Sequence, residues 1–154
     1  MSQAVTPLNG YALAVAAAVL WGLLYVLDER LLAGISIYRL YFLHSIAGVA
    51  VAGTVLLLRG EEPASLLRLS FPGVSPLLVL ATMAVVVLAC LAIFSSIQAL
   101  GASRAAVLEI SYPLFVAIFA WLLARQPIHW PVIVGGIFIF IGSAIIVGWS
   151  AHEG

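Results

Sequence analysis

The stretch AVLEISYPLF, residues 106–115, places a carboxylate and a helix-breaking ring inside one of the most apolar parts of the chain. Glu109 and Pro113 are four residues apart, so a helix through this stretch carries both on one face. Pro113 has no N–H to donate to the carbonyl of Glu109, and its ring clashes with that carbonyl. The pattern therefore predicts a helix that kinks at Pro113, with a carboxylate beside the kink.

The composition of the whole chain is that of a protein embedded in lipid. Of 154 residues, 65% are hydrophobic and only 8% are charged, and the mean hydropathy is +1.25. A soluble domain has about 45–50% apolar and about 25% charged residues. All six basic residues are arginines and the formal net charge is zero, so no basic surface attracts nucleic acid. We predict a membrane protein.

Five apolar runs are long enough to cross about 30 Å of hydrocarbon as helices. Ser75-Pro76 is a typical helix start, and Gly101 is a typical residue just after a helix end. The prediction is an all-α, polytopic membrane protein with one domain over residues 1–154, placed in the cytoplasmic membrane. Its five transmembrane helices are predicted at residues 6–27, 36–58, 75–100, 103–123 and 130–149.

The arginines are equal in number on the two sides of the membrane, unless Arg39, which lies slightly inside a span, is discounted; the bias is then one charge and favours a cytoplasmic N-terminal side. Five spans put the two termini on opposite sides, and each side receives three arginines: Arg59, Arg68 and Arg125 with the N-terminus, and Arg30, Arg39 and Arg104 with the C-terminus. The positive-inside rule needs an imbalance to set one orientation. A balanced chain is able to insert both ways, and two inverted copies then form a pseudo-twofold transporter of the inverted-repeat kind. The alternatives are a parallel dimer, a partner chain of fixed orientation, or a fixed monomer.

Glu109 is the residue with the strongest functional hypothesis, because an ionised carboxylate in lipid costs several kcal/mol. It must face a cavity, pair with a cation or stay protonated. Tyr112 lies on the same helical face as Glu109. The alternative is a carboxylate at the interface, paired with Arg104 or Arg39.

Polar and aromatic side chains on three other predicted helices are candidates to line the same path. An aromatic pair one turn apart can form the wall of a cavity, an arginine near a helix start can pair with Glu109, and an amide can bind a polar ligand. The alternatives are anchoring at the lipid headgroups for the second helix and hydrogen bonds between helices for the third. These candidate substrate-binding residues are Trp21, Tyr25, Tyr38, Arg39 and Gln98, which join Glu109 and Tyr112.

Catalytic motifs are missing from the sequence. His44, His129 and His152 have no metal-ligand spacing, and there is no G-x-S-x-G, no H-E-x-x-H and no glycine-rich phosphate loop. An enzyme within the membrane would need two converging catalytic groups, and no such pair is evident. We therefore expect no enzymatic activity, no metal and no cofactor.

Three segments resemble the EamA domain of the drug/metabolite transporter superfamily. They are LWG at residues 20–22, ISIYRLYFLHSIAG at residues 35–48, and the long stretch at residues 93–148 in which a proline-containing helix is followed by a short polar turn and a glycine-rich last helix. The resemblance covers nearly the whole chain. Two details differ from the family pattern, because Tyr112 stands where many members have Glu before the proline, and Arg125-Gln126 stands where the turn usually reads Gly-Glu.

The resemblance implies a function and a partner. Most members carry two such domains in tandem, so this single repeat is expected to work with a second half, either as a homodimer (antiparallel or parallel) or as a heterodimer. The expected activity is export of a small metabolite or drug-like molecule across the lipid bilayer by alternating access, with proton coupling through Glu109. The alternative is a structural subunit of a membrane complex that transports nothing, in which Glu109 is closed into an ion pair.

Overall fold

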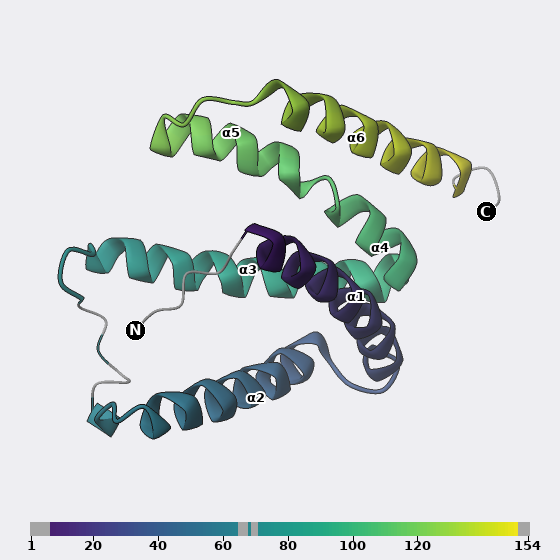
Figure 1. The fold of residues 1–154 in the computed structure, drawn as a ribbon. Coiled ribbons are helices and arrows are strands. Elements are labelled where there is room, and N and C mark those ends of the chain that lie inside the picture. Colours follow the sequence, from purple (N-terminus) through teal and green to yellow (C-terminus); the bar gives the residue numbers. More distant parts are fainter. Residues whose placement is uncertain (1–6, 65–67, 69–70, 151–154) are drawn as a thin grey trace. The chain divides into compact units, whose positions relative to one another are not determined.

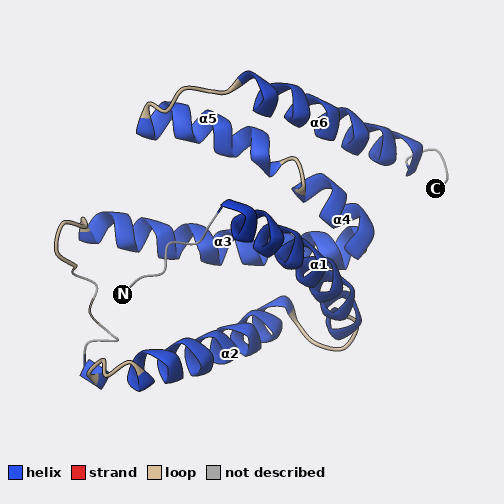
Figure 2. Ribbon diagram, in the orientation of Figure 1, coloured by secondary structure: helices blue, strands red, loops and turns tan. Residues whose placement is uncertain are grey.

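The structure is a computed structural model that describes residues 7–64, 68 and 71–150. The predicted start at residue 6 and His152 therefore lie outside the described residues. All the regular elements of the described chain are helices, as Figures 1 and 2 show. They are α1 (Pro7–Leu32), α2 (Ile37–Leu58), α3 (Pro76–Leu100), α4 (Ala102–Glu109), α5 (Tyr112–Ala124) and α6 (Trp130–Ser150).

Local sequence explains where several of these helices begin and end. The Ser36 side chain accepts a hydrogen bond from the backbone N–H of Arg39 at 3.3 Å, which caps the start of α2. Gly101 has φ +82°, a left-handed conformation that favours glycine, and it separates α3 from α4 by one residue. Arg125 ends α5 in the left-handed helical conformation, at φ 50° and ψ 29°.

The first helix is longer than the sequence predicted. The charged residues after Leu27 were expected to end it, but α1 continues to Leu32. Charge limits the length of chain that hydrocarbon accommodates, whereas Glu and Arg are favourable residues inside a helix. The helix ends instead at the turn after it, where the N–H groups of Gly34 and Ile35 both bond to the carbonyl of Leu31 at 2.9 Å.

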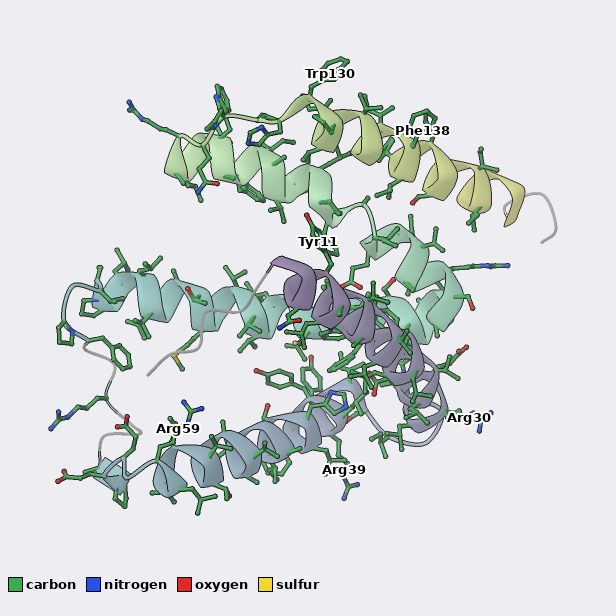
Figure 3. All side chains as sticks on the ribbon, in the orientation of Figure 1. Tyr11, Arg30, Arg39, Arg59, Trp130 and Phe138 are labelled. Carbon is green, nitrogen blue, oxygen red and sulfur yellow. The ribbon has the colours of Figure 1, made fainter. Side chains whose placement is uncertain are left out.

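Most of the described helical stretches have the length and apolar surface of membrane spans. Four stretches qualify by length and hydropathy, namely Asn9–Leu32, Ile37–Leu58, Pro76–Leu100 and Ala102–Ala124, and a shorter apolar helix covers Trp130–Ile146. Large apolar side chains point outward all along them. Trp130 and Phe138, each 71% exposed, project from α6 away from α5 in Figure 3. The predicted fold class, an all-α polytopic membrane protein of about five helices, is confirmed.

The chain divides into two compact units. The unit of residues 30–95 contains α2 and most of α3. Its two helices are joined by an edge-to-face contact of the His44 and Phe94 rings, whose centroids are 5.4 Å apart. Leu40, near the start of α2, is fully buried. Arg39 and Arg59 lie near opposite ends of α2 (Figure 3).

The other unit consists of residues 1–29 and 96–154, of which the structure describes 7–29 and 96–150. It contains almost all of α1, the last residues of α3, and α4, α5 and α6. Helix α6 packs along both α4 and α5, as Figure 1 also shows. This unit contains the sequence stretch with Glu109 and Pro113.

A buried glycine sets the distance between α5 and α6. A Cβ atom added to Gly136 would collide with the side chain of Leu114, whereas one added to the neighbouring Gly135 would meet nothing within 4 Å. The absence of a side chain at Gly136 therefore lets the two backbones approach closely, as small residues do between membrane helices.

Gly136→Ala is expected to lower the free energy of unfolding by about 1–3 kcal/mol, because overpacking forces neighbouring groups apart. Thermal or SDS-induced unfolding of the purified protein in detergent measures this. Gly135→Ala is the matched control and should leave stability unchanged or slightly higher, and a second change, Leu114→Ala, should recover part of the loss. Equal stability of the two alanine variants would contradict close contact at Gly136.

Candidate functional site

The site begins at the interruption between α4 and α5. Helix α4 ends at Glu109 and α5 begins at Tyr112, so Ile110 and Ser111 form a turn between them, and Pro113 is the second residue of α5. The backbone N–H of Ser111 bonds to the carbonyl of Leu108 at 3.3 Å, three residues back, and the Ser111 hydroxyl donates to the same carbonyl at 2.8 Å. Pro113 supplies no N–H for the carbonyl of Glu109. The α-helical hydrogen-bond pattern is therefore broken beside the carboxylate.

A serine from α6 replaces one of the lost hydrogen-bond donors. In a continuous α-helix the carbonyl of Val107 would accept from the N–H of Ser111, but that N–H turns to Leu108 instead. The hydroxyl of Ser143 lies 2.8 Å from the carbonyl of Val107 and 3.0 Å from that of Ile139 in its own helix. Ser143 is buried, so this donor satisfies a backbone group that has no water to bind.

A cavity of about 580 Å³ adjoins the interruption. One wall comes from α1 and the other from α4, α5 and the turn between them. Short side chains make room for the cavity and aromatic rings form much of its lining. The residues that line it are Ala18, Trp21, Gly22, Tyr25, Ala106, Glu109, Ile110 and Tyr112.

Trp21 and Tyr25 form the aromatic wall on α1. Their rings meet edge to face at 67°, with centroids 6.3 Å apart, a favourable geometry for two aromatic rings. Tyr25 is only 5% exposed, and its hydroxyl has no hydrogen-bond partner among the described residues. A buried hydroxyl without a partner costs about 1–3 kcal/mol, so Tyr25 marks a place where the described chain leaves a polar group unsatisfied.

Glu109 supplies the charge of the cavity. It lies about 10 Å along its span from Ala102, since each residue of a helix adds about 1.5 Å. Arg104 does not line the cavity, and within the described part of the chain Glu109 makes no ion pair. The predicted alternative, in which Arg104 neutralises Glu109, is therefore not what this unit adopts. Arg39 belongs to the other unit.

The structure brings together four of the seven candidate residues. Trp21, Tyr25, Glu109 and Tyr112 all line the cavity. Gln98, at the end of α3, is exposed and is not among the lining residues. Tyr38 and Arg39 are exposed residues at the start of α2 in the other unit.

Other residues of the site were not singled out from the sequence. Ala18, Gly22 and Ser143 are not among the candidate substrate-binding residues that the sequence predicted. The signal that could have identified Ser143 is a hydroxyl within an apolar helix, in a chain where a proline leaves a carbonyl on another helix without its donor. Sequence alone does not say which carbonyl is left or which helix reaches it.

The lining of the cavity resembles that of a small-molecule site more than that of a metal site. Within the residues that the structure describes, no group of three His, Cys, Asp or Glu side chains is placed to hold a metal ion. The cavity combines one carboxylate, three aromatic rings and short apolar side chains, which is the usual make-up of a small-molecule site.

The fold and the site together define a multi-pass α-helical membrane protein with a polar group in a cavity between its helices. Comparison with known families identifies the group to which it belongs. The sequence profile of the EamA-like transporter family matches residues 8–148, so the chain belongs to that family. No curated protein and no solved structure matches the chain. The predicted membership of the EamA family is confirmed.

Proposed function

We propose that the protein exports a small molecule across the cytoplasmic membrane by alternating access, and that it does so as a homodimer of single repeats. The cavity beside Glu109 is the observation that carries this proposal. Among the described residues, the Glu109 carboxylate lines this cavity without an ion pair, beside the interruption between α4 and α5. Transporters typically bind substrates near the bilayer midplane at such interruptions, because free backbone groups there can bind polar atoms.

A second copy of the chain supplies the missing half in this proposal. One repeat of about five helices leaves most large apolar side chains exposed and leaves the Tyr25 hydroxyl without a partner in the described chain. The equal arginine numbers on the two sides support an inverted arrangement of the two copies. In that arrangement Tyr38, Arg39 and Gln98 are candidates to extend the substrate path.

Proton coupling through Glu109 completes the proposal. A carboxylate that binds either a proton or a substrate couples the transport of the substrate to the transport of the proton. The titratable side chains that line the cavity with it are Tyr25 on α1 and Tyr112 on α5, and α6, which packs on α4 and α5, has no titratable side chain. Asp28 and Glu29 on α1 also belong to this unit but do not line the cavity, so Glu109 is the carboxylate of the cavity lining that is suited to exchange its proton with a substrate.

A cysteine at Gly22 tests for a substrate path without knowledge of the substrate. Gly22 lines the cavity in the middle of α1, and an added Cβ meets nothing within 4 Å. In a Cys90→Ser background, Gly22→Cys is expected to react with a water-soluble, membrane-impermeant maleimide, because the thiolate that reacts forms only where water reaches.

Phe138→Cys is the matched control, since Phe138 points from α6 away from α5 (Figure 3) and faces lipid in this proposal. It should stay unlabelled under the same conditions until the membrane is dissolved. If Gly22→Cys is as unreactive as Phe138→Cys, the cavity is closed to water. The structural-subunit alternative would then replace the transport proposal.

A further inference from the structure

We propose that the cavity binds an organic cation, in which a positively charged nitrogen carries apolar groups. This inference rests on the proposed function, since it names the substrate class of the same cavity. Three properties of the cavity support it independently of one another. They are its charge, its aromatic lining and its size.

The charge of the cavity is negative and is not balanced by the side chains around it. Among the described residues that line the cavity, Glu109 is the only one with a formal charge at neutral pH, and none is an arginine or histidine. A carboxylate within a membrane span requires a cation or a proton to offset the cost of leaving water. A cationic ligand supplies that charge, whereas an anionic ligand would add a second uncompensated negative charge.

The aromatic lining favours the same class of ligand. Trp21 and Tyr25 come from α1 and Tyr112 comes from α5, so rings stand on both walls. Tyr25 is buried against Trp21 in their edge-to-face contact, whereas Trp21 and Tyr112 are 57% and 58% exposed and can present ring surface to a ligand. The face of an aromatic ring attracts a cation, and the attraction is largest when water is excluded.

The size of the cavity separates an organic cation from a metal ion. A volume of about 580 Å³ lies within the range of about 300–1,000 Å³ that is usual for small-molecule sites. Ala18, Gly22 and Ala106 keep this space open because their side chains are short. A bare metal ion would need several converging oxygen or nitrogen ligands, whereas the lining offers one carboxylate.

Equilibrium binding of radiolabelled benzyltrimethylammonium to the purified full-length protein tests the proposal. Unlabelled competitors then separate charge from shape. Neopentylbenzene has the same shape with carbon in place of the charged nitrogen, and phenylacetate has the opposite charge. We expect saturable binding of the cation. Each competitor should need a concentration about tenfold or more higher than unlabelled benzyltrimethylammonium to displace the label, a difference in binding free energy of about 1.4 kcal/mol.

Two variants locate the binding in the cavity. Glu109→Gln, which keeps the shape of the side chain, is expected to weaken binding of the cation by about 30-fold or more, since it removes one partner of a desolvated charge pair. Trp21→Leu is expected to weaken it by up to about 30-fold through loss of the ring face. The matched controls are Glu62→Gln, in the loop after α2, and Trp130→Leu, on the exposed side of α6 (Figure 3), which should bind as the unchanged protein does.

The outcomes distinguish this inference from the proposed function. If neopentylbenzene or phenylacetate competes as well as the cation does, or if the cation does not bind saturably, the substrate class is wrong. The comparison of the two isosteres uses the unchanged protein, so it holds even if a variant does not fold. If Gly22→Cys reacts with the maleimide but the cation does not bind, the protein is a transporter of another substrate class. If the cation binds but Gly22→Cys does not react, the cation site stands and the transport proposal is overturned.

Discussion

Glu109→Gln is expected to make substrate binding and transport insensitive to pH. If the proposed coupling holds, a cation and a proton compete for the Glu109 carboxylate in the unchanged protein, so affinity for the cation should fall as pH decreases and rise as Glu109 ionises. Coupling between two ligands is typically about 1–3 kcal/mol, or about 5–150-fold in affinity. The glutamine variant has no proton to exchange, so it should bind weakly at every pH and should not respond to a pH gradient.

Two measurements check this expectation. Benzyltrimethylammonium affinity is measured across pH for Glu109→Gln and for the control Glu62→Gln, which removes the same charge from the loop after α2. Release of a proton on binding is then followed with an indicator dye in weakly buffered solution. If Glu109→Gln keeps the pH response of the unchanged protein, Glu109 is not the coupling acid and proton coupling through it is ruled out.

If the protein inserts in both orientations as proposed, removing one arginine is expected to leave it mainly in a single orientation. The two sides of the membrane hold three arginines each in the predicted topology, so one charge decides the majority. Arg104→Gln should place the N-terminal side in the cytoplasm. Arg125→Asn should place the opposite side there, and asparagine tolerates the left-handed backbone of Arg125 at φ 50°.

Labelling of a cysteine at Ser2, in a Cys90→Ser background, reports the orientation in intact and opened cells. Arg104→Lys and Arg125→Lys keep the charge and should give the mixture of the unchanged protein. Cells with either neutral variant alone should lose transport, and cells with both should recover it, because only the mixture supplies two inverted copies. A single orientation in the unchanged protein would rule out the antiparallel homodimer and favour a parallel or hetero-oligomeric assembly.

The sequence was most informative where one physical effect dominates. Runs of about 20 apolar residues predicted the spans. Hydrocarbon offers no hydrogen-bond partners for backbone N–H and C=O groups, and a helix pairs these groups within itself. The end of α1 was less predictable. Asp28 to Arg30 end the apolar run, but the helix continues to Leu32, since no charged residue prevents a helix from propagating.

The candidate site was predictable in its principal residues and not in its surroundings. Glu109, Trp21, Tyr25 and Tyr112 stood out because carboxylates and paired aromatic rings are informative in an apolar chain. The contact of Ser143 with the carbonyl of Val107 was not predictable, because it joins residues 36 positions apart. Neither was the difference between Gly135 and Gly136, which depends on where Leu114 lies.

For this protein the amino-acid sequence alone determined that the chain lies in a lipid bilayer, that it is helical, and that a carboxylate stands four residues before a proline. These are local properties, set by hydrophobicity and by the missing N–H of Pro113. Only the tertiary structure decided that α1 faces the interruption between α4 and α5, and that a cavity of about 580 Å³ opens there instead of an ion pair. Those outcomes depend on which helix faces meet, and contacts between helices distant in sequence are set by packing of the whole unit.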